Sequence, residues 1–448
     1  MKTALLLWLG AAPMFSAGLR AGAARIDITP SHPIWMSGYA SRNHPSTGVR
    51  QPLFARALAI DDGRTRTVIV TTEVVGLPAE LADRVAARAQ SQFGIERARL
   101  VLNSTHTHTG PVVWPNLGTM FSLSADEESK LRDYSAQLAD KLVAVIGQAI
   151  SDLAPAQLSA GFGAVGFAMN RREPTANGIK IGVNPKGPTD HEVPVIRVAA
   201  ADGRVRAILF AYACHNTTLG GDFYELTGDY AGFAAAALES EYPGAVALFM
   251  ILCAGDQNPE PRGTIELAER HGRDLAAEVR RVLAGRMMPL DGPVRAAWLV
   301  TTLPFAPRSR TDYEADLANP KASGPLQRRA QLMLDHPVRE TAYPVQAIRF
   351  AKELTLIALG GEAVVDYDLR AKREYPGERL IVAAYSNSVM CYIPSERVLR
   401  EGGYEAVDNL VYYGQPGPFA PGVEQRVFDA IHKVMQSVGR RPRGSDGS

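Results

Sequence analysis

The apolar positions of the chain follow two patterns, short continuous apolar runs and longer stretches with a helical repeat. Runs such as VRAILFAYACH (205–215), AVALFMILCAGD (245–256) and ELTLIALGGEAVVDY (353–367) are typical of strands. The helical repeat appears at residues 78–94, 125–152, 230–242, 265–284 and 424–438. This mixture is typical of α/β or α+β enzymes, and we predict an α/β fold, with a mixed sheet and flanking helices in one large domain at 24–438.

Local sequence signals add detail at three segments of the chain. The segment 55–78 reads as a hairpin around the turn Asp61-Asp62-Gly63. The helix at 125–152 opens with Ser124 and an acidic first turn, as expected of a helix N-terminus. The polar segment 311–336 interrupts the pattern, and it is either an insertion or lid, or a pair of surface helices.

The N-terminus resembles a secretory signal. Lys2 precedes the short apolar run ALLLWLGAAPMF and the small residues SAGLRAGAA. We therefore expect a signal peptide at 1–23, cleaved between Gly18 and Ala23, and a secreted or periplasmic protein; the alternative is a buried N-terminal helix or strand. At the other end, the polar residues 439–448 predict a disordered tail.

Charge and cysteine content exclude several classes of function. The 48 basic and 47 acidic residues give a net charge of +1, so nothing favours nucleic acid as a partner. The three cysteines, Cys214, Cys253 and Cys391, match no zinc motif and are expected to be small buried apolar residues, with a single disulfide left open.

Polar groups that can bind metals or carry protons cluster where apolar runs stop. The ends are NSTHTHTGP, FAYACHNTTLGG, LCAGDQNPE and LGGEAVVDY, and a fifth, VMCYIP, ends on a tyrosine. Several strands that deliver His, Asp, Glu and Tyr to their ends are how α/β enzymes build a site at one edge of a sheet.

The pair His106 and His108 stands out among only nine histidines. If the run before them continues as a strand, residues two apart share a face, which suits either a metal site or a structural edge. With His215 and Glu362, the pair offers the ligands that zinc takes, and bound zinc lowers the pKa of water to about 7. A lone His215 could equally be a core histidine. Asp256 could either accept a hydrogen bond from a metal-binding histidine or cap a turn.

Together these motifs resemble the neutral (non-lysosomal, alkaline) ceramidases, zinc-dependent amidases of the secretory route. STHTHTGP is similar to the family's Thr-His-Thr-His-Ser-Gly-Pro motif, and ACHNTT with TGDYAGF to the segment of its second zinc histidine. MNRREP, CAGDQNP, GGEAVVDY and CYIPSERVLREGGYEA resemble further loops of the family's site. The resemblance runs from ARIDITP to beyond GGYEA.

The resemblance implies a zinc centre whose ligands are His106, His215, Glu362 and Tyr392. It implies that His108 binds substrate or shuttles protons, that Asn258 takes the place of the family's active-site serine, and that Arg171 and Tyr404 line the site as polar contacts to the substrate. In this reading, either His108 or Asp256 handles protons. The expected reaction is cleavage of an N-acyl amide, ceramide or a related lipid or small molecule, by zinc-activated water. Peripheral contact with a membrane goes with a lipid substrate.

Two departures from the family leave alternatives open. Asn258 cannot act as a nucleophile, although it can donate a hydrogen bond to an oxyanion. Thr217, Thr218 and Ser386 offer hydroxyl groups instead, but the sequence does not place them in the site. The family's additional C-terminal immunoglobulin-like domain is not part of the resemblance. The alternatives are a zinc esterase or amidase with another substrate, and a metal-binding homologue with an eroded site. A Cys253 nucleophile is disfavoured because the preceding FMIL predicts a buried thiol.

Overall fold

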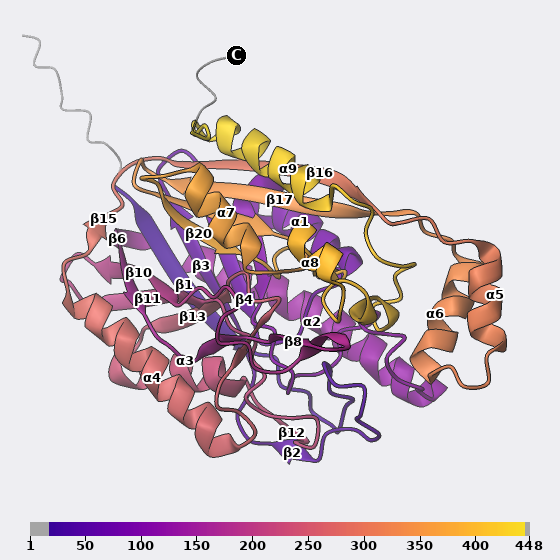
Figure 1. Ribbon diagram of the computed structural model, residues 1–448. Coiled ribbons are helices and arrows are strands. Elements are labelled where there is room, and N and C mark those ends of the chain that lie inside the picture. Colours follow the sequence, from indigo (N-terminus) through magenta and orange to yellow (C-terminus); the bar gives the residue numbers. More distant parts are fainter. Residues whose placement is uncertain (1–17, 444–448) are drawn as a thin grey trace, which may run out of the picture.

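The computed structural model describes residues 18–443, whose main strands form two sheets packed face to face (Figure 1). The larger sheet, in the order β13-β11-β10-β6-β1-β3-β4-β5 with β15 beside β6, contains β1 (Arg20–Asp27), β3 (Phe54–Asp61), β4 (Arg66–Thr72), β5 (Leu100–Ser104), β6 (Ala154–Ala164), β10 (Glu192–Ala200), β11 (Val205–Tyr212), β13 (Val246–Ile251) and β15 (Met288–Pro289). The smaller sheet, in the order β16-β17-β18-β20, contains β16 (Val294–Pro304), β17 (Glu340–Phe350), β18 (Leu354–Leu359) and β20 (Arg379–Ala383). Both sheets mix parallel and antiparallel pairs, so the predicted mixed α/β fold is confirmed, with its strands divided between two sheets.

Side chains that alternate along each strand of the larger sheet point either to the smaller sheet or to the helices on the outer side. In β11, Leu209 lies in the core between the two sheets, whereas Phe210 faces the helices on the outer side. That outer side carries α1 (Ala79–Phe93), α2 (Ala125–Ser151), α3 (Asp229–Glu241) and α4 (Ile265–Ala284), while α7 (Asp366–Glu374) and α9 (Val423–Ser437) cover the smaller sheet (Figure 1). The site lies where the strand ends of both sheets meet.

The helix and hairpin signals read from the sequence are confirmed. Ser124 and Glu127 form a capping box at the start of α2, and α1 ends at Gly94, whose φ of 69° is left-handed. Strands β3 and β4 form the predicted hairpin. The segment 311–336 is a pair of helices, α5 (Arg310–Ala318) and α6 (Gly324–Asp335), which projects from the side of the molecule (Figure 1).

One predicted strand is partly wrong. The run at 353–367 breaks after β18, and residues 366–374 form helix α7. Asp366 and Asp368 stand in its first turn, where carboxylates are stabilised by the helix dipole. Tyr367, Asp368 and Ala371 are all buried, and a helix places residues i, i+1 and i+4 on one side whereas a strand would point Tyr367 and Asp368 to opposite faces.

Short elements complete the fold around the site. They are β2 (Gly48–Val49) with β12 (Glu225–Leu226), β7 (Ala168–Asn170) with β14 (Gln257–Pro259), β8 (Arg172–Thr175) with β9 (Gly178–Ile181), β19 (Glu362–Ala363) with β21 (Tyr392–Ile393), α8 (Glu396–Glu401), and the 3-10 turns Arg97–Arg99 and Asp408–Val411.

The predicted terminal segments fall partly outside the described residues. Of the predicted signal peptide, residues 1–17 lie outside them, and β1 begins at Arg20. In the predicted tail, Arg440 forms an ion pair with Glu378 (2.7 Å) and the Arg443 amide donates to the Glu374 carbonyl, so order extends at least this far. Residues 444–448 lie outside the described residues.

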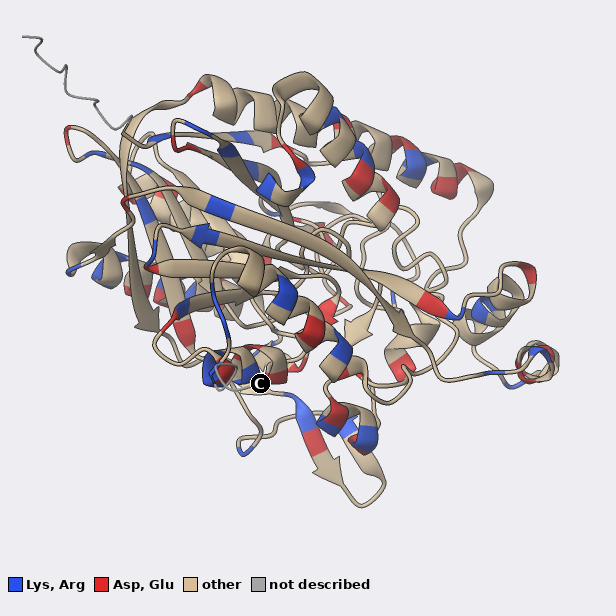
Figure 2. Cartoon of the chain, turned by 90° about the horizontal axis from the view of Figure 1, so that it is seen from above, with Lys and Arg blue, Asp and Glu red and all other residues tan. Residues whose placement is uncertain are grey.

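The balanced charge and the buried cysteines expected from the sequence are both seen in the structure. Positions of basic and acidic residues are interspersed along the chain in the cartoon of Figure 2. Among residues 18–443, no helix has both the length and the apolar character needed to cross a membrane. Cys214, Cys253 and Cys391 are free and buried, and burial raises the pKa of the Cys253 thiol well above its usual value, so it is not a reactive nucleophile.

Candidate metal centre

His106 lies in a loop beyond the end of β5. Its φ of 63° is left-handed, so the strand does not continue through the histidine pair. The expectation that His106 and His108 share a strand face is therefore wrong, yet the two rings meet because the loop folds back, with 3.0 Å between their Nε2 atoms.

His215 joins them from the end of β11. A β-bridge between Thr107 and Asn216 holds the two histidine loops together. The side-chain nitrogens of His106, His108 and His215 lie within 4.8 Å of one another, and all three residues are buried, a group that could hold a metal ion.

Glu362 and Tyr392 reach the same point from the second sheet. They stand opposite each other in the parallel pair β19 and β21, just beyond β18. Glu362 Oε2 lies 3.0 Å from His106 Nε2 and 3.1 Å from His215 Nε2, and the Tyr392 hydroxyl lies 3.0 Å from His215 Nε2. The structure thus brings together the four residues that the resemblance pointed to.

Three distances between these donor atoms, 3.0–3.1 Å, are close to the ligand spacing around a small tetrahedral ion. Bonds of about 2.0–2.1 Å place neighbouring ligand atoms about 3.3 Å apart. The Nδ1 atoms of His106 and His215 face the carbonyls of Val75 and Ala254, which fixes their rings with Nε2 toward the cluster. His108 differs, because its buried Nδ1 has no hydrogen-bond partner among the described residues.

The protonation states suit metal binding. Burial, reinforced by the charge of Arg171, lowers the pKa of His215 to about 3, and burial beside the other imidazoles lowers the pKa of His108 well below its usual value. Burial alone would raise the pKa of Glu362, but His106 and His215 hold it well below its usual range. His108 and His215 are therefore neutral while Glu362 is ionised, and metal binding requires these protonation states of imidazole and carboxylate ligands.

Arg171 borders the cluster. Its guanidinium donates to the Tyr392 hydroxyl (3.0 Å), to Asn258 Oδ1 (3.2 Å) and to Glu405 Oε1 (2.8 Å). It also lies 5.7 Å from the ring of Tyr404, which packs edge-on against Tyr392. Both predicted substrate contacts, Arg171 and Tyr404, thus lie beside the predicted ligands.

Asn258 is held by its carbonyl oxygen. Strand β14 pairs with β7, and Asn258 Oδ1 accepts from Arg171 and from the Thr217 hydroxyl (3.2 Å). Its amide nitrogen has no hydrogen-bond partner within the described part of the chain, so it stays available as a donor. Of the nearby hydroxyls, only Thr217 contacts Asn258 here, while Ser386 donates to the Ala384 carbonyl.

Asp256 does not accept a hydrogen bond from a histidine, so that prediction is wrong. Its carboxylate accepts from the Asn170 side chain (2.9 Å) and from the Val365 amide (2.8 Å), and its carbonyl accepts from the Arg171 amide (2.8 Å). The physical reason is direction, since the turn after β13 points the carboxylate at the neighbouring loops. Asp256 ties the Arg171 loop to the segment after Glu362.

Two residues that the sequence reasoning missed complete the site. Tyr413 donates its hydroxyl to Glu362 Oε1, and Glu405 bridges Arg171 and Arg172. The dense run of tyrosines and acids after Tyr404 was the signal that could have found them.

Gly38 presses the N-terminal loop against His108. Its φ is 93°, and a Cβ atom there would lie 2.3 Å from His108 Nδ1. Arg42 donates to the His108 carbonyl (2.7 Å), and the ring of Tyr39 lies edge-on, 5.0 Å from the imidazole. Only glycine allows this approach.

Comparison with known sequences identifies relatives. The model of the neutral/alkaline non-lysosomal ceramidase family, N-terminal part, matches residues 19–272. A neutral ceramidase from Mycobacterium tuberculosis is 25% identical over 253 residues, 51% of this chain and 38% of that protein. Neutral ceramidase B of Dictyostelium discoideum is 26% identical over 262 residues, 54% of this chain and 36% of that protein. The aligned part is little more than a third of either relative.

Solved structures share the fold over more of the chain. Neutral ceramidase from Pseudomonas aeruginosa superposes with a TM-score of 0.71 at 20% identity, covering 95% of this chain and 75% of that one. A ceramidase complexed with C2 gives a TM-score of 0.72 at 18% identity, covering 94% of this chain and 75% of that one.

Proposed function

Because the chain belongs to the neutral/alkaline non-lysosomal ceramidase family of hydrolases, we propose that it is a zinc-dependent amidase that cleaves an N-acyl amide, ceramide or a related compound. The observation that carries the proposal is the convergence of two imidazoles, a carboxylate and a phenol at spacings of 3.0–3.1 Å. Nitrogen and oxygen donors of this kind suit zinc.

The metal would be held by His106, His215, Glu362 and Tyr392. Zinc in such a site polarises a carbonyl and lowers the pKa of water, which supplies a nucleophile at neutral pH.

The surrounding residues act on the substrate and its protons. His108 is neutral and lies 3.0 Å from His106, so it can accept a proton from the attacking water and return it to the leaving amine. The free amide nitrogen of Asn258 donates to the developing oxyanion, and the Arg171 side chain fixes the orientation of that amide. Tyr404 borders the substrate beside Arg171.

Metal content and hydrolysis test the proposal together. The protein purified without chelators should carry about one zinc per chain and hydrolyse an N-acyl panel that includes a ceramide analogue. His106→Ala should lose both, while His32→Ala, at an exposed position, should keep both. Absence of zinc from the wild type, with hydrolysis unchanged in His106→Ala, refutes the proposal.

A second candidate keeps the metal but changes the reaction, because an asparagine stands where the family has its serine. Matched O-acyl esters in the same panel identify an esterase by their faster turnover. Asn258→Ser is the test for an eroded site: a large gain in amide hydrolysis at unchanged metal content identifies a metal-binding protein that has lost catalysis.

We also propose export by the N-terminal segment, with cleavage at the early end of the expected range. Strand β1 pairs with β3 from Arg20 onward, so cleavage at Ala23 would remove part of a core strand. Mass spectrometry of the mature protein should find a first residue between Gly18 and Arg20. An uncleaved N-terminus contradicts export by this route.

A further inference from the structure

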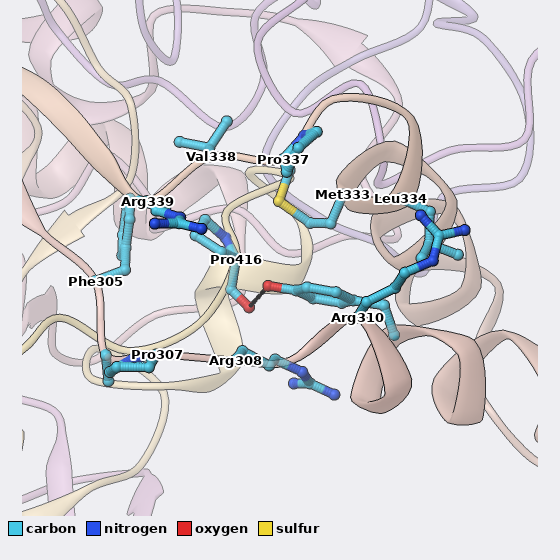
Figure 3. Close-up of a pocket in the computed structure, with 12 residues that line it drawn as sticks. Phe305, Pro307, Arg308, Arg310, Met333, Leu334, Pro337, Val338, Arg339 and Pro416 are labelled. Carbon is cyan, nitrogen blue, oxygen red and sulfur yellow. Dashed lines mark hydrogen bonds between the residues drawn. The ribbon is translucent and has the colours of Figure 1, made fainter.

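A cavity lies beside the α5–α6 helix pair, and none of the residues that line it belongs to the candidate metal centre. It has a volume of about 580 Å³, within the range of small-molecule sites. Figure 3 shows Phe305, Met333, Leu334 and Val338 around it, with Pro416. These side chains come from the ends of β16, β17 and α6, so the cavity is a feature of the fold and not of one loop.

The apolar lining is partly open to solvent. Met333 is buried, but Val338 is 40% exposed at the rim. Tyr313 anchors the helix pair across the cavity, since its buried hydroxyl donates to the Pro416 carbonyl (3.1 Å). The cavity therefore has fixed walls and an open side through which an alkyl chain can enter.

The charged residues that line the cavity are all arginines. Its lining includes Arg308, Arg310 and Arg339 and no acidic residue. Arg308 pairs with Asp316, and Arg310 with Glu314 (2.8 Å). The guanidinium of the exposed Arg339 makes no ion pair or hydrogen bond with any residue of the described range 18–443. Arg339 thus leaves one cation unmatched beside an apolar wall.

We propose that this cavity binds a fatty-acid anion, with the alkyl chain along Phe305, Met333 and Val338 and the carboxylate on Arg339. A guanidinium binds a carboxylate through paired N–H donors, and the apolar wall removes the alkyl chain from water. The proposal goes beyond the function proposed above and does not depend on it, because no ligand of the metal centre lines this cavity.

Calorimetric titration with sodium dodecanoate, kept below its micelle-forming concentration, tests the proposal. The wild type should bind one dodecanoate, and Arg339→Ala should weaken binding by about tenfold or more, because a charged hydrogen bond is lost. Arg204→Ala, at an arginine 60% exposed on a distant turn, should bind as the wild type does. Circular dichroism confirms that each variant is folded.

Two further measurements distinguish binding in this cavity from binding at the candidate metal centre and from unspecific binding of an alkyl chain. His106→Ala should bind dodecanoate as tightly as the wild type, whatever becomes of its hydrolysis and metal content. Dodecyltrimethylammonium, with the same chain and the opposite charge, should bind at least tenfold more weakly. The proposal is overturned if His106→Ala abolishes binding while Arg339→Ala does not, or if the two amphiphiles bind equally well.

Discussion

Replacing Glu405 tests how much its buried ion pairs with Arg171 and Arg172, beside the candidate metal centre, contribute to the free energy of unfolding. Glu405 is 1% exposed and pairs with both Arg171 and Arg172, which are themselves almost fully buried. Glu405→Gln keeps the shape of the side chain but turns an amide NH2 toward a guanidinium. Because both arginines stay charged, the variant leaves the buried Arg171 without a carboxylate partner, and Arg172 keeps only the partly exposed Glu401.

The magnitude follows from burial. Removing one partner of a buried ion pair costs about 3–5 kcal/mol. Glu401 provides a matched control, since it also pairs with Arg172 (3.1 Å) but is 33% exposed. Pairs open to solvent contribute about 0–1 kcal/mol, so Glu401→Gln should lose less than about 1 kcal/mol.

The assay is denaturant unfolding of both variants beside the wild type, after a check that refolding restores the signal. If unfolding is irreversible, the unfolding rates at one denaturant concentration replace the free energies. Equal losses below about 1 kcal/mol for Glu405→Gln and Glu401→Gln would refute the reasoning, because burial would then have made no difference.

Three further predictions concern the site and its surroundings. Gly38→Ala should displace the His108 ring, so hydrolysis should fall by about a hundredfold while the metal content stays unchanged. Tyr413→Phe removes a hydrogen bond to Glu362 and should weaken metal affinity about 10- to 100-fold in a chelator competition. Burial raises the pKa of Asp256 from 3.8 to about 6, so its ionisation destabilises the folded protein as the pH rises through that window. Relative to Asp256→Asn, the wild type should lose about 2 kcal/mol of unfolding free energy between pH 4 and 7.

Each of these predictions has a control or a contrary outcome. Gly203→Ala places the same change at a left-handed glycine with open space around it (φ 84°), so an equal loss of hydrolysis there would exclude displacement of His108 as the cause. Tyr412→Phe, next to Tyr413, should leave metal affinity unchanged, because its hydroxyl has no hydrogen bond in the described part of the chain. A flat difference between the wild type and Asp256→Asn across that pH range contradicts the raised pKa.

Which residues come together was easier to predict, from the strand ends and the family resemblance, than how they are arranged. His106, His215, Glu362 and Tyr392 each follow an apolar run, and a strand end is recognisable from a short window of sequence. The turn at His106 was not predictable, because a φ of 63° in a histidine depends on contacts with distant loops.

The residues that the sequence did not reveal act through tertiary contacts. Tyr413 and Glu405 lie in an irregular segment with no periodic pattern, and their partners are 51 and 234 positions away in the chain. The orientation of Asp256 likewise depends on where Val365 and Asn170 come to lie. The two-sheet arrangement also escaped prediction, because strand runs do not show which strands pair.

The division of the metal centre between two sheets sets an order of events during synthesis. The three histidines belong to the first half of the chain, but Glu362 and Tyr392 are synthesised 147 and 177 residues after His215. A domain generally folds as a unit, and here the two sheets share one core. A metal ion would therefore be captured with full affinity only after synthesis of both sheets is complete and the second sheet has docked.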